Sequence, residues 1–415
     1  MMKKKNGFTL VELVAILAVL GVIAILVLPG VKSNINNKKE KQYNDIVNVI
    51  ENAAKSYYYQ TSSGTKITLE ELANNKYIDS DITNPKTNEK MTGCVIVSKD
   101  NGYNTFKYID DLSLCDKSLA GYITSLYNDD GTRTINGLKK DNTSDGNIRY
   151  EGSNPNNYVK FNDELWRIIG VFGSNVKIIR SESIGKLSRD SSESSVNGRN
   201  GVNEWSTSDL KEYLNIMYYG GTEVTCYAER NNATTTCPKV SLNSDAKQLI
   251  DNHTWNVSSS GYIESLSTVD SYNKERGTTT GKTCTGGSYC NDTVERTTSW
   301  TGYVALPYVT DWAYASSESI CKTSIYTKDT NENYICKNNN WMHYGSTITD
   351  SVWTLSSSSG SVYACSAYVL YGDGHIHSLG SAFPLTVFPT VYLKSNVKVA
   401  GGTGTSTDPY ILSRS

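Results

Sequence analysis

The chain has 415 residues, which is long enough for two or three domains with separate hydrophobic cores. Its 40 lysine and arginine residues nearly balance 42 aspartate and glutamate residues, which gives a formal net charge of −2. Because non-specific binding to nucleic acid depends on a broad surplus of basic side chains, this balance argues against DNA as a partner. Tyrosine (29) far outnumbers phenylalanine (6), a mix that suits short strands joined by polar turns.

The first 29 residues carry the clearest pattern in the sequence. A short basic segment, residues 1–7, runs into an apolar segment, residues 8–29, about long enough to cross a bilayer as a helix. An ordinary secretory signal peptide or a plain membrane anchor would be the simplest interpretation. However, a secretory cleavage site follows the apolar segment, whereas Gly7 precedes it. Glu12 also places a carboxylate inside the predicted span, where a charge is costly and indicates a function.

Residues 3–26, KKKNGFTLVELVAILAVLGVIAIL, closely resemble the prepilin signal of type IV pilins, type II secretion pseudopilins and Gram-positive competence pseudopilins. This resemblance implies that a prepilin peptidase cuts after Gly7 and N-methylates Phe8. It also implies that Glu12 pairs with the new terminal amine of a neighbouring subunit and that Pro29 bends the helix. Such a buried charge pair contributes more to the register of the subunits than to their stability.

The same resemblance implies where the protein resides and what it binds. The lysines before the span are expected on the cytoplasmic side, with the rest of the chain outside. We therefore expect a single-pass chain in the cell membrane before assembly, and an extracellular pilus or cell-surface location afterwards. The expected partners are the prepilin peptidase, other pilin subunits through the N-terminal helix, and the membrane.

After the leader, residues 1–7, a transmembrane and stalk helix is predicted over residues 8–59. Its second half has apolar residues at spacings of three and four, the pattern of one helix face: these are Tyr43, Ile46, Val47, Ile50, Ala53, Ala54 and Tyr57. A small pilin-like head is expected at 60–118. It should contain a helix that begins at Leu69 behind the capping residue Thr68, and strands at 94–98 and 103–109. The polar segment 119–147 is interpreted as a linker.

Residues 148–415 are expected to form a larger β-rich surface domain, so the predicted fold class is α+β. Strands are expected within 158–183 and at several places after residue 351, and helices within 205–219 and 244–250. Four strings resemble C-type-lectin-like and formylglycine-generating-enzyme-like domains: ELWRIIG (164–170), WSTSDLKEYLN (205–215), VWTLSSS (352–358) and FPTVYLKSNV (388–397). The calcium-binding strings of sugar-binding lectins, EPN or QPD with WND, are not present in the sequence.

Nine cysteines without a C-x-x-C string, together with only four histidines, favour structural disulfides outside the cytoplasm over zinc sites. The pairing cannot be deduced from the sequence, and one cysteine must be left over. Cys365 has no near partner in sequence. The other eight are the disulfide candidates: Cys94, Cys115, Cys226, Cys237, Cys284, Cys290, Cys321 and Cys336.

No catalytic or cofactor site is predicted. His375 and His377 would share one face of a strand and, with Asp373, could form half a metal site. Because no third ligand is identifiable, we interpret them as a polar turn and strand end. The sequence contains no G-x-S-x-G, H-E-x-x-H or P-loop string, so the protein is not expected to be an enzyme.

Tryptophans in the large domain suggest one further hypothesis. If exposed, they would form a platform for carbohydrate or protein, and otherwise they would fill the core; the candidates are Trp205, Trp300, Trp312 and Trp341. The sequence thus predicts a minor or tip subunit of a type IV pilus or pseudopilus that displays an adhesin-like or lectin-like domain. The alternatives are a structural priming pseudopilin of a secretion or DNA-uptake system and, last, a surface enzyme.

Overall fold

The structure is a computed structural model. It describes residues 10–61, 66–100, 103–110, 112, 115, 117–127, 137–192, 201–229, 231–258, 267–277, 297–325, 330–343, 351–358 and 366–414, without the side chains of 10–34, 98–100, 330 and 366. The chain divides into two compact units. The first unit comprises residues 1–97 and 106–115, and the second unit comprises residues 98–105 and 116–415. The mixture of helices and strands agrees with the predicted α+β class.

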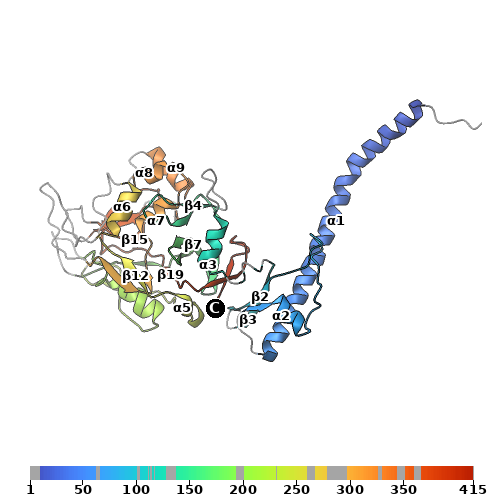
Figure 1. Ribbon diagram of the computed structural model, residues 1–415. Helices are drawn as coiled ribbons and strands as arrows, with labels where there is room; N and C mark the ends of the chain where they lie inside the picture. Colours follow the sequence, from blue (N-terminus) through green and yellow to red (C-terminus); the bar gives the residue numbers. More distant parts are fainter. Residues whose placement is uncertain are drawn as a thin grey trace, which may run out of the picture. The chain divides into compact units, whose positions relative to one another are not determined.

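The first unit is built on one long helix, α1 (Leu10–Thr61), drawn in blue in Figure 1. A short helix and a three-stranded sheet of order β1-β2-β3 complete it: α2 (Leu69–Asn74), β1 (Lys66–Thr68), β2 (Cys94–Asp100) and β3 (Tyr103–Ile109). As predicted, the Thr68 side chain caps α2 by accepting from the Glu71 amide at 3.1 Å.

The predicted apolar face of the stalk helix is confirmed. Ile50, Ala54 and Tyr57 are buried, and Tyr43, Ile46 and Val47 are partly buried against the same core. Side chains of α2 and of the sheet complete this core: Ile67, Leu69, Leu72, Met91, Val95, Val97 and Tyr108. Among the described residues, no helix is long and apolar enough to cross a membrane. The predicted span, residues 8–29, has no side chain within the described part of the chain.

The second unit centres on a nine-stranded sheet of order β14-β19-β8-β7-β6-β21-β20, with β5 paired to both β7 and β4. Most neighbours are antiparallel, but β21 runs parallel to β6. The predicted strands within 158–183 are the hairpin β6-β7-β8 at its centre. The strands are β4 (Leu138–Lys140), β5 (Ile148–Tyr150), β6 (Tyr158–Phe161), β7 (Glu164–Phe172), β8 (Asn175–Arg180), β14 (Val304–Ala305), β19 (Thr390–Leu393), β20 (Lys398–Gly401) and β21 (Tyr410–Ser413).

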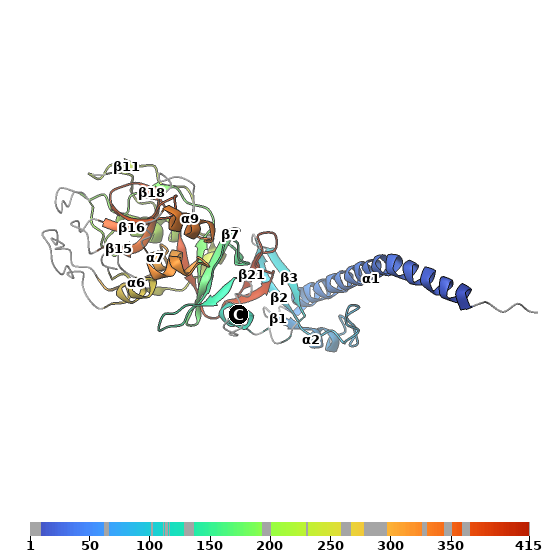
Figure 2. The same cartoon turned by 90° about the horizontal axis from the view of Figure 1, so that it is seen from above.

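A five-stranded sheet of order β17-β16-β15-β18-β9 forms a second layer of strands, and β15, β16 and β18 are labelled side by side in Figure 2. Its strands are β9 (Lys186–Leu187), β15 (Val352–Ser357), β16 (Ser366–Leu370), β17 (Ile376–Gly380) and β18 (Leu385–Thr386). Two short strand pairs are added: β10 (Cys226–Tyr227) with β11 (Thr234–Thr235), and β12 (His253–Asn256) with β13 (Ser299–Gly302).

Short helices pack around these sheets. The helix predicted within 205–219 begins behind Ser208, whose hydroxyl accepts from the Lys211 amide, and it continues as the π-helix η2. The helix predicted at 244–250 is α5, capped by Asn243. The helices are α3 (Leu119–Leu126), α4 (Asp209–Glu212), η2 (Tyr213–Tyr219), α5 (Ser244–Leu249), α6 (Thr268–Glu275), α7 (Val309–Tyr314), α8 (Ile320–Thr323) and α9 (Thr330–Asn338).

The predicted linker at 119–147 is wrong over much of its length. Residues 119–126 form α3, which Ser118 caps, and Leu119, Ala120 and Ile123 lie in the core of the second unit. Leu138 of β4 is also fully buried there. The segment is polar on average, but its few apolar residues fall on one helix face and one strand position, and this was enough to bury them.

Three disulfides join cysteines within the described residues. Cys94 pairs with Cys115 in the first unit, while the Cys226–Cys237 and Cys321–Cys336 disulfides cross-link segments of the second unit. Each closes a loop of 11 to 21 residues, for which chain entropy gives roughly 3 kcal/mol of stabilisation. Cys284, Cys290 and Cys365 lie outside the described residues.

Because α3 and β4 belong to its core, the second unit should fold as the fragment 116–415. The shorter fragment 145–415, which lacks both elements, should not fold. Losing Leu119, Ile123 and Leu138 removes roughly 5 kcal/mol of burial, a large share of a typical domain stability. Urea unfolding followed by near-ultraviolet circular dichroism measures this difference.

A point substitution tests the same packing within the fragment 116–415. Ile123→Ala should lower the free energy of unfolding by about 2–5 kcal/mol, because Ile123 has no exposed surface. Ser125→Ala, on the exposed face of α3, is the matched control and should change it by less than about 0.5 kcal/mol. Equal effects of the two substitutions would contradict the placement of α3 in the core.

Candidate functional site

The structure describes no side chain of the four residues predicted to act in the prepilin-like signal. Gly7 and Phe8 lie outside the described residues. Glu12 and Pro29 lie in α1, but their side chains are outside the described part of the chain. The roles predicted for these four residues therefore remain predictions, and the described site candidates are in the second unit.

Three of the four candidate tryptophans fill the core and do not form an exposed platform. Trp205, Trp312 and Trp341 are only 1 %, 2 % and 4 % exposed, and all three belong to the core of the second unit. Trp300 is partly buried and packs edge-on against Trp205, with ring centroids 5.9 Å apart. These aromatic side chains fill space in the core of the second unit.

The histidine pair lies on a turn and strand of the smaller layer. The Nδ1 atom of His375 is 2.5 Å from a carboxylate oxygen of Asp373, while His377 Nδ1 contacts the Ser378 carbonyl oxygen at 2.8 Å. The two imidazole rings are 6.3 Å apart and nearly perpendicular. Among the described residues, no group of three or more histidine, cysteine, aspartate or glutamate side chains is placed to hold a metal ion.

The second unit contains a cavity of about 510 Å³. It lies where β4 and β5 approach α6, α7 and α8, which Figure 1 shows gathered at one end of this unit. Strands β4 and β5 pair with each other and are joined by the loop over residues 141–147, so they bring charged side chains to one wall of the cavity. Its charged lining residues are Lys139, Lys140, Asp141, Arg149, Glu151 and Lys322.

Arg149 reaches the cavity from the interior of the sheet. On neighbouring strands, Gly170 of β7 lies opposite both Arg149 of β5 and Lys177 of β8, so the three residues form a row across the sheet. A Cβ atom on Gly170 would lie 2.4 Å from the Ile148 carbonyl oxygen and 3.3 Å from Cγ of Arg149. Only glycine at this position leaves room for the arginine side chain to cross over the strand.

A buried ionic network holds Arg149 in place; we call Asp141, Arg149, Lys177 and Asp311 the buried network. The Arg149 guanidinium donates from Nε to Asp141 at 2.7 Å and from Nη1 to Asp311 at 2.8 Å. The other carboxylate oxygen of Asp311 accepts from Lys177 Nζ and, at 2.9 Å, from the Tyr308 amide. Each of these side chains is at most 3 % exposed, so the charges are compensated almost entirely by one another.

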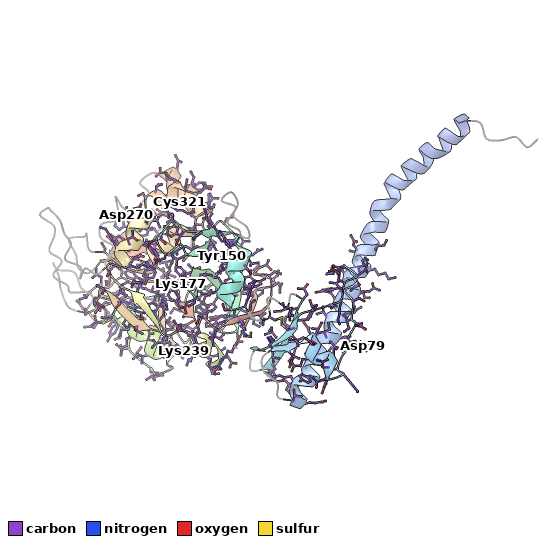
Figure 3. The ribbon with its side chains drawn as sticks, in the orientation of Figure 1. Asp79, Tyr150, Lys177, Lys239, Asp270 and Cys321 are labelled. Carbon is purple, nitrogen blue, oxygen red and sulfur yellow. A yellow bond between two sulfur atoms is a disulfide. The ribbon has the colours of Figure 1, made fainter. Side chains whose placement is uncertain are left out.

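Aromatic rings surround the two cations of the network. Lys177 Nζ lies 4.1 Å from the ring centroid of Tyr308, and the Arg149 guanidinium lies 4.6 Å from that of Phe172 and 4.7 Å from that of Tyr314. Figure 3 labels Lys177 in the interior of this unit. Such cation–π contacts partly replace the hydration that both cations lose on burial.

The network and its surroundings have shifted pKa values. Burial lowers the pKa of Lys177 to about 8, although Asp311 opposes this effect. Burial by itself would raise the pKa of Asp311, but Lys177 and Arg149 overcome it and hold that pKa below its usual range. Glu275, at the end of α6, accepts from Ser356 at 2.6 Å and from Thr310 at 2.8 Å. Burial raises the pKa of Glu275 to about 7.

The residues of this region were not predicted from the sequence to form a site. Arg149, Lys177 and Asp311 were missed because each stands alone in its segment, and strand pairing together with the packing of α7 brings them together from positions up to 162 residues apart. A charged residue in the apolar strand VKIIR was the signal that could have identified Lys177. The arrangement presents an arginine and three lysines to a solvent-accessible cavity, which suits the binding of an anionic group.

The raised pKa of Glu275 predicts a specific pH dependence of stability. The folded unit holds a proton on this carboxyl between about pH 4.5 and 7, where the unfolded chain has released it, so the free energy of unfolding falls as pH rises through this window. Glu275→Gln in the fragment 116–415 should remove this contribution, which is roughly 3 kcal/mol in full.

Urea unfolding at pH 5, 6 and 7.5 measures the effect, with Glu223→Gln as the matched control at an exposed carboxylate. The stability of Glu275→Gln should increase relative to the control as pH rises. Parallel curves for the two variants would show that Glu275 is not protonated preferentially in the folded unit.

Comparison with known proteins gives a match at the N-terminus. A family model described as the prokaryotic N-terminal methylation motif matches residues 2–28. No curated protein and no solved structure matches the chain. The match supports a type IV pilin-like protein that is processed by a prepilin peptidase and assembles with other pilins, and it favours membrane insertion followed by a place in a surface pilus.

Proposed function

We propose that this protein is a minor or tip subunit of a type IV pilus or pseudopilus and that it displays its second unit as a domain for binding an extracellular ligand. The observation that carries the proposal is the combination of the methylation motif at residues 2–28 with a second unit that has its own core and a cationic cavity. In this scheme α1 anchors and assembles the subunit, and the second unit supplies the adhesin-like function.

The size and the disulfides of the second unit support a displayed role. Residues 116–415 make up most of the chain, and a domain of this size on every subunit would crowd a filament. Two disulfides join described cysteines of this unit, as expected for a domain exposed to an oxidising exterior. The resemblance of four of its strings to lectin-like domains agrees with ligand binding, and we include that fold relationship in the proposal.

A binding role is favoured over catalysis. Lys177 and Glu275 have strongly shifted pKa values, which is a property of many catalytic groups, but both are fully buried. Neither residue is among the described residues that line the cavity. Their hydrogen-bond and ionic partners account for their burial, so we assign them to the structure of the domain and propose no enzymatic activity.

Processing at the N-terminus is directly testable. Gly7→Leu should block cleavage, because the resemblance places the prepilin peptidase site after Gly7, and the chain should then retain residues 1–7. Intact-mass analysis and N-terminal sequencing measure this, and the wild-type chain should begin with methylated Phe8. Gly30→Leu, at the other end of the apolar segment, is the matched control and should be cleaved normally. A cleaved Gly7→Leu chain would contradict the assigned processing site.

The display role is tested by truncating the chain after Cys115, which keeps the Cys94–Cys115 disulfide and the core of the first unit. If the second unit is a displayed binding domain, cells with this truncation should make pili in normal numbers but lose adhesion. Electron microscopy of pili and an adhesion count on host or matrix surfaces measure the two outcomes. Loss of pili would instead support the alternative role as a structural priming pseudopilin.

A further inference from the structure

We infer that the cavity beside Arg149 binds an acidic saccharide and that Arg149, together with the lysines at its rim, holds the carboxylate or sulfate group of that saccharide. This inference rests on the proposed function, because it names the ligand class of the domain that the pilus would display. In this site, Arg149 of the nine-stranded sheet contacts the anionic group of the ligand.

The charge of the cavity lining is the first argument. Among the described lining residues, four side chains are cationic and two, Asp141 and Glu151, are carboxylates. Asp141 is engaged by Arg149, and Glu151 lies 2.5 Å from Lys322 Nζ and 3.8 Å from Lys139 Nζ. The described lining residues therefore carry an excess of two positive charges, in a protein whose overall charge is slightly negative. Such a local excess favours an anionic ligand.

The hydrogen-bonding state of Arg149 is the second argument. Its side chain is 3 % exposed, and Nε and Nη1 are used by Asp141 and Asp311. The Nη2 atom is buried and has no hydrogen-bond partner among the described residues. Leaving a buried donor unpaired costs about 1–3 kcal/mol, and an oxygen of a bound carboxylate or sulfate would satisfy it. The stacking against Phe172 and Tyr314 fixes the plane of the guanidinium before any ligand arrives.

The rest of the lining favours a saccharide over other anions. Hydroxyl groups of Ser267, Ser317, Ser319 and Thr323 line the cavity together with the ring of Tyr314, which suits a polyhydroxylated ligand. Val269 is the only aliphatic side chain among the described lining residues, so the cavity offers little to the apolar side chains of a peptide. A volume of about 510 Å³ lies within the range of small-molecule sites and is far larger than a single inorganic anion needs.

The test uses the full chain, purified in a non-ionic detergent, and isothermal titration calorimetry with matched probes. The acidic probes are digalacturonate, which is carboxylated, and a sulfated heparin disaccharide. The neutral control is the dimethyl ester of digalacturonate, and sodium sulfate tests for binding of a simple anion. At least one acidic disaccharide should bind, and more tightly than the neutral ester and than sulfate. Its affinity should fall as salt rises from 50 to 300 mM.

Two exposed lysines allow a variant that leaves the fold intact. Lys139→Gln combined with Lys140→Gln should weaken binding of the acidic disaccharide by about tenfold, because two charges of the rim are lost. Lys239→Gln, at an exposed lysine of the same unit that does not line the cavity, is the control and should bind normally. Arg149→Lys should also weaken binding, and its circular dichroism must match the wild type for this result to count.

The outcomes separate this inference from the proposed function. Equal binding of the acidic and neutral disaccharides, binding of sulfate as tight as that of the acidic disaccharides, or insensitivity to the paired lysine substitutions would overturn the acidic-saccharide site. Absence of binding by both acidic probes would also overturn it. None of these results would touch the displayed-domain proposal, which the truncation after Cys115 decides by adhesion and pilus number.

Discussion

The second unit depends on one buried carboxylate, Asp311. One of its carboxylate oxygens accepts a hydrogen bond from Arg149 of β5, and the other accepts from Lys177 of β8. The second oxygen also accepts from the Tyr308 amide at the start of α7. Removing a partner from such a network leaves an uncompensated charge in the interior and typically costs 3–5 kcal/mol. The ionic contacts therefore tie a helix, two strands and the turn at Asp141 into one arrangement.

The same arrangement explains how a basic cavity can exist next to a neutral interior. Within the network two cations face two carboxylates, so the interior carries no excess charge. The positive surplus lies at the edge of the unit, where Lys139 and Lys140 extend into solvent from β4. Arg149 and Asp141 belong both to the buried network and to the cavity lining, and Arg149 can reach the cavity because Gly170 carries no side chain on the neighbouring strand.

Sequence patterns predicted the parts of the fold that depend on local order. The buried face of α1 around Ile50 and Ala54, the cap of α2 at Thr68 and the hairpin β6-β7-β8 all follow from spacing and turn chemistry. The cavity and the buried network could not be predicted, because they depend on which strands become neighbours in a nine-stranded sheet. Helix α3 was missed for another reason: its buried residues are too few to outweigh a polar segment in composition.

The position of α3 has a mechanical consequence for a subunit held in a filament. Helix α3 begins four residues after Cys115 in the sequence. At its start, the Leu119 amide donates to the Val397 carbonyl oxygen at 2.6 Å, and Ser118 forms an isolated β-bridge with Lys398 of β20. Tension along the chain would thus reach the nine-stranded sheet at β20, an edge strand, through hydrogen bonds. The force would reach β20 before it reaches β4 and β5, the strands that carry Lys139, Lys140 and Arg149 of the cavity.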